Sequence, residues 1–113
     1  MSVLGIDSGF SKIGYAVIED GRVRGAGTWR PKTHYKKLNE QSIHKIRVML
    51  PIVEETITRF NVDAIAVEIV PTLPMGQRDK VLAIENLFRV VSAMKGVLYQ
   101  EVPAVTVKKL VVS

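Results

Sequence analysis

Cysteine does not occur in this sequence of 113 residues. A chain without thiols has no disulfide framework, no zinc–thiolate site and no catalytic cysteine, and it fits a reducing compartment. No apolar run approaches the roughly 18 residues of a membrane span, and the first residues enter a predicted strand without a signal-peptide layout. Internal repeats and low-complexity tracts are absent as well. The sequence therefore predicts neither a disulfide-rich scaffold nor a membrane-spanning protein.

The composition is that of a globular protein. Apolar residues make up 47% of the chain and charged residues 24%, which argues against disorder. The length suits one domain with a real hydrophobic core. The net charge of +5 favours an anionic partner, of which nucleic acid is the commonest.

The stretch 4–18 predicts a short strand, a tight turn and a second strand. Asp7 stands where the first strand ends. We expect Gly9 to let the chain turn with a positive φ and to let another group approach the backbone. A carboxylate at this place suits a divalent cation or a metal-bound phosphate. The alternative is that Asp7 only begins the turn, as Asp often does.

The remaining pattern predicts an α/β fold with a mixed sheet. Three strands form an antiparallel meander, and helices then alternate with strands. The first strand should lie centrally, antiparallel to the second and parallel to the fourth. Asp20-Gly21 is a hairpin signal, and Pro51 predicts a kinked first helix or two abutting helices. The expected strands are 2–7, 12–19, 22–30, 64–70 and 97–102, and the expected helices are 38–60, 77–94 and 107–110.

Apolar residues at steps of three and four mark one face of each long helix. The second helix has more apolar residues, Leu82 and Val90, than contact with one sheet requires. The expected faces are Ile43, Ile46, Leu50, Val53, Ile57 and Phe60 in the first helix, and Val81, Ile84, Leu87, Phe88, Val91 and Met94 in the second.

A second acid, Glu68, lies within an apolar strand, where a carboxylate is costly unless it is paired or bound to a metal. Strand alternation puts Asp7 and Glu68 on one sheet face among small residues. Parallel strands carry their ligand crevice beyond their carboxyl ends, so we expect both acids at its rim. Two close carboxylates repel by ~4 kcal/mol at an effective dielectric of about 20, and a divalent cation between them reverses that sign. Two metal ions about 3.5–4 Å apart would clamp a phosphodiester.

The segment 30–37 combines four basic residues with two aromatic rings. It is either a solvated loop, the commoner outcome for a charge cluster, or a loop that grips phosphates while one ring stacks on a base. The candidate residues are Arg30, Lys32, His34, Tyr35, Lys36 and Lys37.

Several segments together resemble the RuvC-type Holliday junction resolvases of the ribonuclease H-like superfamily. The first motif is matched by LGIDSG at 4–9 and GYAVI at 14–18, and the second acidic strand by DAIAVE at 63–68. The likeness continues in GVL at 96–98, EVP at 101–103 and VKK at 107–109. The resemblance implies a ribonuclease H-like sheet of five strands flanked by helices, in a single domain 1–113 that is incomplete at its C-terminus.

The resemblance also implies a function. The family hydrolyses phosphodiester bonds in four-way DNA junctions as a cytoplasmic homodimer that depends on Mg²⁺ or Mn²⁺. Asp7 and Glu68 would be the metal ligands, and Lys108 would stabilise charge near the scissile phosphate. The helix 77–94 would contain the dimer seam. With the six candidates in 30–37, the DNA-binding candidates are then Arg30, Lys32, His34, Tyr35, Lys36, Lys37, Met75, Lys108 and Lys109.

Two departures from the family pattern modify this expectation. The family has further acidic ligands on a C-terminal helix, whereas no acid follows Glu101 here. We therefore expect a four-carboxylate site not to be completed within these residues, and nuclease activity to be weak or absent. The family also has an aromatic residue shortly after the second acid, where this chain has Pro71. Met75 or Leu73 is the candidate apolar wedge in its place.

Two other functions are compatible with the sequence. Asp7-Ser8-Gly9 before a second strand also resembles the first phosphate loop of actin-like sugar kinases, whose amides bind phosphate, although Glu68 fits that interpretation less well. The third reading is a DNA-binding or dimerisation module without catalysis. A preference for branched DNA separates the nuclease from the kinase, and magnesium-dependent cleavage separates the enzyme from the module.

Overall fold

The computed structural model describes residues 1–69 and 75–103, with the side chains of Ile69 and Met75 left aside. Its strands are β1 (Ser2–Asp7), β2 (Ile13–Glu19), β3 (Arg22–Trp29), β4 (Ala64–Ile69) and β5 (Leu98–Pro103). The helices are α1 (Leu38–Arg59) and α2 (Met75–Lys95). The expected helix 107–110 lies outside the described residues. Neither α1 nor α2 combines the length and apolar character that a membrane crossing requires.

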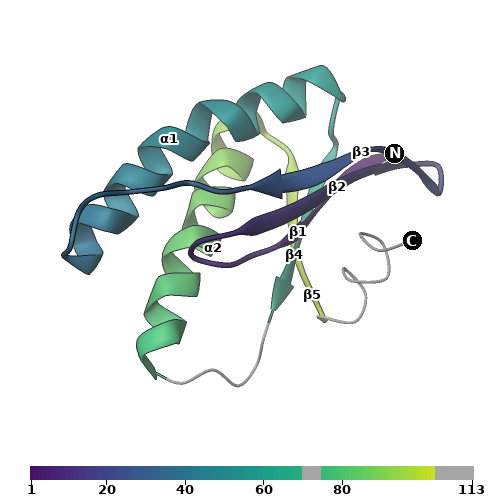
Figure 1. Ribbon diagram of the computed structural model, residues 1–113. Helices are drawn as coiled ribbons and strands as arrows, with labels where there is room; N and C mark the ends of the chain where they lie inside the picture. The colour runs from purple at the N-terminus through teal and green to yellow at the C-terminus, as the bar shows by residue number, and fades with distance from the viewer. Residues whose placement is uncertain (70–74, 104–113) are drawn as a thin grey trace.

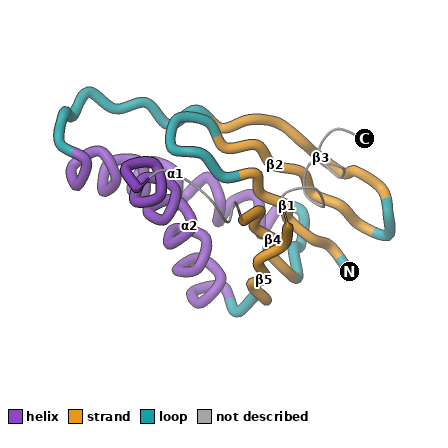
Figure 2. Tube along the Cα trace, turned by 90° about the horizontal axis from the view of Figure 1, so that it is seen from below, coloured by secondary structure: helices purple, strands orange, loops and turns teal. Residues whose placement is uncertain are grey.

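The five strands form one mixed sheet in the order β3-β2-β1-β4-β5. Strand β1 lies at its centre, antiparallel to β2 and parallel to β4, and β4 is parallel to β5. The predicted fold class and strand arrangement are therefore confirmed. Figure 1 shows the strands side by side, and Figure 2 shows both helices on the same side of the sheet.

Local sequence explains the connections that fix the strand register. Asp20 and Gly21 have φ of 52° and 77°, the conformation of a two-residue hairpin turn that Asp-Gly favours. Between β1 and β4, the Ser2 amide donates to the Asp63 carboxylate at 2.8 Å, and the Asp63 amide donates to the Ser2 carbonyl at 2.8 Å. This pair of hydrogen bonds ties the beginnings of the two parallel strands together.

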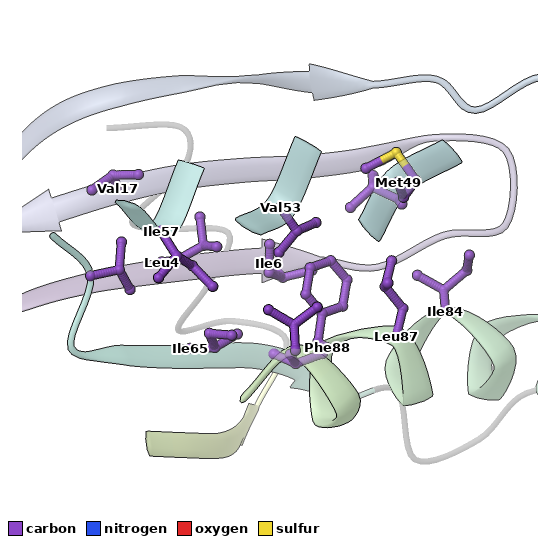
Figure 3. Packing of buried hydrophobic residues seen from close by; sticks show 14 residues of the cluster. Leu4, Ile6, Val17, Met49, Val53, Ile57, Ile65, Ile84, Leu87 and Phe88 are labelled. Carbon is purple, nitrogen blue, oxygen red and sulfur yellow. The ribbon is translucent and has the colours of Figure 1, made fainter. Parts of the chain in front are cut away.

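The core lies between the sheet and the two helices. Large residues of β1 and β4, among them Leu4 and Ile65, face α1 and α2 and are fully buried. In Figure 3, Val53 and Ile57 of α1 point toward these strand residues, and Phe88 of α2 packs beside them. The opposite sheet face therefore presents the alternate residues of β1 and β4.

Helix α1 buries most of its predicted face: Val53 and Ile57 belong to the core, and Ile46, Leu50 and Phe60 pack against it. The exception is Ile43, which is 58% exposed, while Met49 and Lys45 are buried as well. The helix also runs through Pro51 as one element, so the alternative of two abutting helices is wrong. In α2, the four central residues of the predicted face, Ile84, Leu87, Phe88 and Val91, are buried, but Met94 is 58% exposed.

Candidate metal centre and nucleic-acid interface

Asp7 and Glu68 are neighbours on the central parallel strands. Asp7 is the last residue of β1, and Ile6 pairs with Val67 in the parallel register. One further step along the two strands places Asp7 beside Glu68. Since Ile6 and Val67 belong to the buried core, strand alternation directs both acids to the face away from the helices. Asp7 is half-buried, and Glu68 is only 2% exposed.

Glycines leave space around Asp7. In the antiparallel ladder, Asp7 faces Gly14, where an added Cβ would lie 3.5 Å from the Asp7 Cβ. At Gly9, an added Cβ would lie 2.6 Å from the Lys12 carbonyl oxygen. Gly9 has no positive φ, so that part of its prediction is wrong, whereas the predicted close approach to its backbone is confirmed. Gly9 is needed because the turn closes on itself.

The donor atoms at this site are oxygens. Two carboxylates follow the last printed pair of the β1–β4 ladder, Ile6 and Val67, at the carboxyl ends of these strands. The buried Ser8 hydroxyl oxygen beside Asp7 has no hydrogen-bond partner in the described parts of the chain. No group of three or more His, Cys, Asp or Glu residues gathers for a metal within residues 1–69 and 75–103. The described site therefore offers two carboxylates to a hard cation.

The basic segment 30–37 runs from the end of β3 to the start of α1 (Figure 1). His34 and Tyr35 stack on each other with ring centroids 4.5 Å apart. The His44 ring of α1 meets the Tyr35 ring edge-on at 5.4 Å. The Gln41 side-chain amide donates to the Tyr35 carbonyl at 2.7 Å and holds the segment to the helix. The exposed residues of the segment are Arg30, Lys32, His34, Tyr35, Lys36 and Lys37.

His44 was missed in the sequence because it has no special spacing relative to the segment 30–37. The other candidates fall in or beside 70–74 and 104–113. Lys108, Lys109 and Leu73 lie outside the described residues. Met75 is the first residue of α2, and its side chain is not described.

A second group of cations, also missed from the sequence, lines a cavity of about 470 Å³ next to the β1–β2 turn. The Lys45 ammonium donates to the Phe10 carbonyl at 2.7 Å and lies 3.7 Å from the centroid of the Phe10 ring. The Lys80 ammonium lies 5.7 Å from the same centroid. Lys45 lies on the same helical face as Met49 and Val53. This four-residue spacing in the sequence could have indicated that Lys45 faces the core.

The chain matches a known protein family over nearly its whole length. The family described as crossover junction endodeoxyribonuclease RuvC matches residues 3–112. No curated protein sequence matches the chain.

Solved structures have the same fold. T. thermophilus RuvC in complex with a Holliday junction substrate gives a TM-score of 0.79 at 21% identity, over 96% of this chain and 68% of that chain. A putative sugar kinase from Cytophaga hutchinsonii gives 0.55 at 11% identity, over 91% and 36%. The yeast mitochondrial Holliday junction resolvase Ydc2 gives 0.52 at 14% identity, over 88% and 50%. The chain thus spans half or less of the last two proteins.

Proposed function

The chain belongs to the RuvC family of crossover junction endodeoxyribonucleases, and from this membership we propose that it binds four-way DNA junctions and hydrolyses phosphodiester bonds in them. The observation on which the proposal rests is the parallel register of β1 and β4. This register brings Asp7 and Glu68 together at the carboxyl end of the central strands, where sheets of this type bind ligands. Since DNA is the substrate, we propose a cytoplasmic location.

The two carboxylates fit a magnesium ion. Mg²⁺ prefers oxygen ligands and is commonly held by one or two carboxylates together with substrate phosphates and water. We propose Asp7 and Glu68 as its protein ligands, with Mn²⁺ as an alternative ion. When bound, the ion supplies Lewis-acid stabilisation of the scissile phosphate and an activated water. Gly14 leaves room for the DNA backbone above Asp7, since no side chain projects from it.

Binding of the junction backbone is assigned to the exposed basic residues of 30–37. Arg30, Lys32, Lys36 and Lys37 provide charges for phosphates, and the stacked pair of His34 and Tyr35 offers an aromatic surface for an unpaired base. The family resemblance adds Lys108 and Lys109 as phosphate contacts, with Lys108 near the scissile bond. Met75 or Leu73 is proposed as an apolar wedge in place of the family's aromatic residue.

We propose further that the protein acts as a homodimer through α2. Leu82, Val90 and Met94 are 44%, 51% and 58% exposed. They recur at multiples of four residues, which places them on one helix face. A second copy of α2 would cover this face and pair two metal sites for the two strands of a junction.

Asp7→Asn tests the metal site, because it removes a charge at nearly constant shape. The expected result is loss of Mg²⁺ binding in calorimetric titration, together with loss of any magnesium-dependent cleavage of a synthetic four-way junction that the unaltered chain shows. Asp20→Asn is the matched control, since it makes the same change in an exposed hairpin turn where Asn tolerates the positive φ.

Unchanged Mg²⁺ affinity in Asp7→Asn contradicts the proposed metal site. Junction binding by the unaltered chain without cleavage at any Mg²⁺ or Mn²⁺ concentration favours the DNA-binding and dimerisation module instead. The likeness to the sugar kinase concerns the fold alone. A preference of the protein for branched DNA over duplex DNA would favour the nuclease over the kinase.

A further inference from the structure

We propose that the cavity beside the β1–β2 turn binds a phosphate group, and that in the junction complex this is a backbone phosphate other than the one that is cut. The second part rests on the proposed function. Both helices and two loops contribute to the cavity, which is lined by Phe10, Ser11, Pro31, Lys32, Thr33, Gln41, Lys45 and Lys80.

The main evidence is Lys45, a residue that is only 4% exposed and whose ammonium donates to the Phe10 carbonyl. A buried charge is costly unless it is paired, and no carboxylate lies within ion-pair distance of Lys45 in the described residues. Its contacts there are the carbonyl and the ring of Phe10. An ammonium has three N–H donors, and the Phe10 carbonyl takes one. An anion in the cavity would use the remaining hydrogen-bonding capacity and neutralise the charge.

A second cation lies close to the first. Burial lowers the pKa of the Lys45 ammonium, and the nearby Lys80 ammonium lowers it further. The two ammonium groups repel each other, and the cavity lining contains no acidic residue. The positive potential there favours binding of an anion. Lys32 adds a third positive charge to the lining. An anion of charge −2 would offset much of this repulsion.

The neutral part of the lining identifies the kind of anion. Ser11, Thr33 and Gln41 contribute hydroxyl and amide donors. Lysine together with hydroxyl and amide groups is the usual set of contacts to phosphate oxygens. A planar carboxylate would be better served by the fork of an arginine, which the lining lacks.

The position of the cavity distinguishes it from the metal site. Lys45 lies on α1 and Lys80 on α2, and both helices cover one face of the sheet (Figure 2). Asp7 and Glu68 are directed to the opposite face by strand alternation. The β1–β2 turn joins the two places, because Phe10 follows Asp7 by three residues. A phosphate held by the lysines is therefore a different group from the one beside the acids.

Thermal unfolding of the full chain with inorganic phosphate tests the site independently of nuclease activity. We expect the Tm to rise with phosphate and not with chloride at equal ionic strength. Lys80→Met is the principal variant because Lys80 is exposed and the substitution leaves the core intact. It should weaken phosphate binding by about tenfold or more, the loss of one charge-assisted hydrogen bond.

Lys45→Met should remove phosphate binding altogether. If Lys45→Met does not fold, Lys80→Met still tests the site. Lys95→Met is the control, since it removes the same charge at the far end of α2 and should leave the phosphate response unchanged. A Tm that does not respond to phosphate, or an equal response in Lys80→Met and in the unaltered chain, overturns the phosphate site.

The salt dependence of junction binding separates the two sources of phosphate. If a backbone phosphate occupies the cavity, Lys80→Met should reduce the slope of log K against log salt by about one unit. Phosphate binding with an unchanged slope overturns the assignment to DNA and indicates a free anion. Failure of the proposed nuclease function would give a different result: Asp7→Asn would keep normal Mg²⁺ affinity, and the Tm would still rise with phosphate.

Discussion

At Gly9 the backbone of the β1–β2 turn leaves no room for a side chain. Gly9→Ala would bring a Cβ within 2.6 Å of the Lys12 carbonyl oxygen, a contact with backbone that only a shift of the turn can relieve. We expect the variant to lose about 1–3 kcal/mol of unfolding free energy, as overpacking costs. Urea denaturation followed by circular dichroism measures the loss.

Gly76→Ala is the control for this substitution. Gly76 lies in α2 without a positive φ, and an added Cβ would meet nothing within 4 Å. Alanine should not destabilise the protein there, because Gly76 is in the first turn of the helix and an added Cβ meets open space. Equal effects of the two substitutions would show that the turn accommodates a Cβ at residue 9 without strain.

Single residues were predicted well where strand alternation decides their direction. The placement of Asp7 and Glu68 follows from the two-residue period and from β1 and β4 being parallel neighbours, so it could be derived from the sequence. The backbone angle of Gly9 could not, because glycine serves a tight approach as readily as a left-handed turn. Lys45 was missed because a lysine is expected at the surface.

Among the elements, α1 shows the limit of reading a helix face from apolar spacing. The sequence offers two stripes, one through Ile43 and Ile46 and another through Met49, and both include Val53. Residues of both stripes pack against the core, among them Ile46 and Met49, whereas Ile43 is exposed. Where the buried face begins depends on how α1 packs against α2 and the strands, and this packing is not encoded locally in the helix.

Ion pairs among Glu85, Arg89 and Glu101 link helix α2 to β5 and make the stability of the protein depend on pH. Glu85 is 9% exposed, its carboxylate lies 3.8 Å from the Arg89 guanidinium, and Arg89 also pairs with Glu101 of β5. Burial raises the pKa of Glu85 above its ordinary 4.5, Arg89 opposes the rise, and Glu101 adds to it. In the folded protein, the ionised form of Glu85 is thus disfavoured.

This raised pKa sets the direction of the effect. The contribution of Glu85 to stability is complete at a pH below its pKa in the unfolded chain. It is lost as the pH rises through its higher pKa in the folded protein. Glu85→Gln should therefore gain stability relative to the unaltered chain between pH 4 and pH 7. Denaturant unfolding at the two pH values measures the difference, with Glu55→Gln at an exposed position of α1 as control. If Glu85→Gln instead loses stability relative to the unaltered chain between pH 4 and pH 7, the attraction of Glu85 to Arg89 dominates.

For the whole molecule, the strand order was predictable because each connection is short and the hydrophobic periods change clearly from strand to helix. Gly21 and Gly96 have positive φ, and the predicted hairpin at Asp20-Gly21 is confirmed. Element boundaries agree with the prediction to within two residues, the usual uncertainty of helix and strand ends. Oligomeric state and the complete ligand set depend on more than the described residues and could not be derived in this way.

The exposed apolar face of α2 predicts the assembly of the molecule. Val90→Glu should convert a dimer to monomers, because a carboxylate at the centre of the face would be desolvated without a partner. Sedimentation velocity measures the change. Ile43→Glu is the control, since Ile43 is 58% exposed on α1 and lies outside the proposed seam. An unchanged sedimentation coefficient in Val90→Glu would contradict dimerisation through α2.

The hydrogen bonds between Ser2 and Asp63 fix where β1 and β4 start relative to each other. From these two residues, five steps along each strand lead to Asp7 and to Glu68. Inserting or deleting one residue within either strand would therefore move one acid to the helix side of the sheet, because each step reverses the side-chain direction. Changes in chain length should be tolerated in the hairpin at Asp20-Gly21, whereas the two central strands have a fixed length.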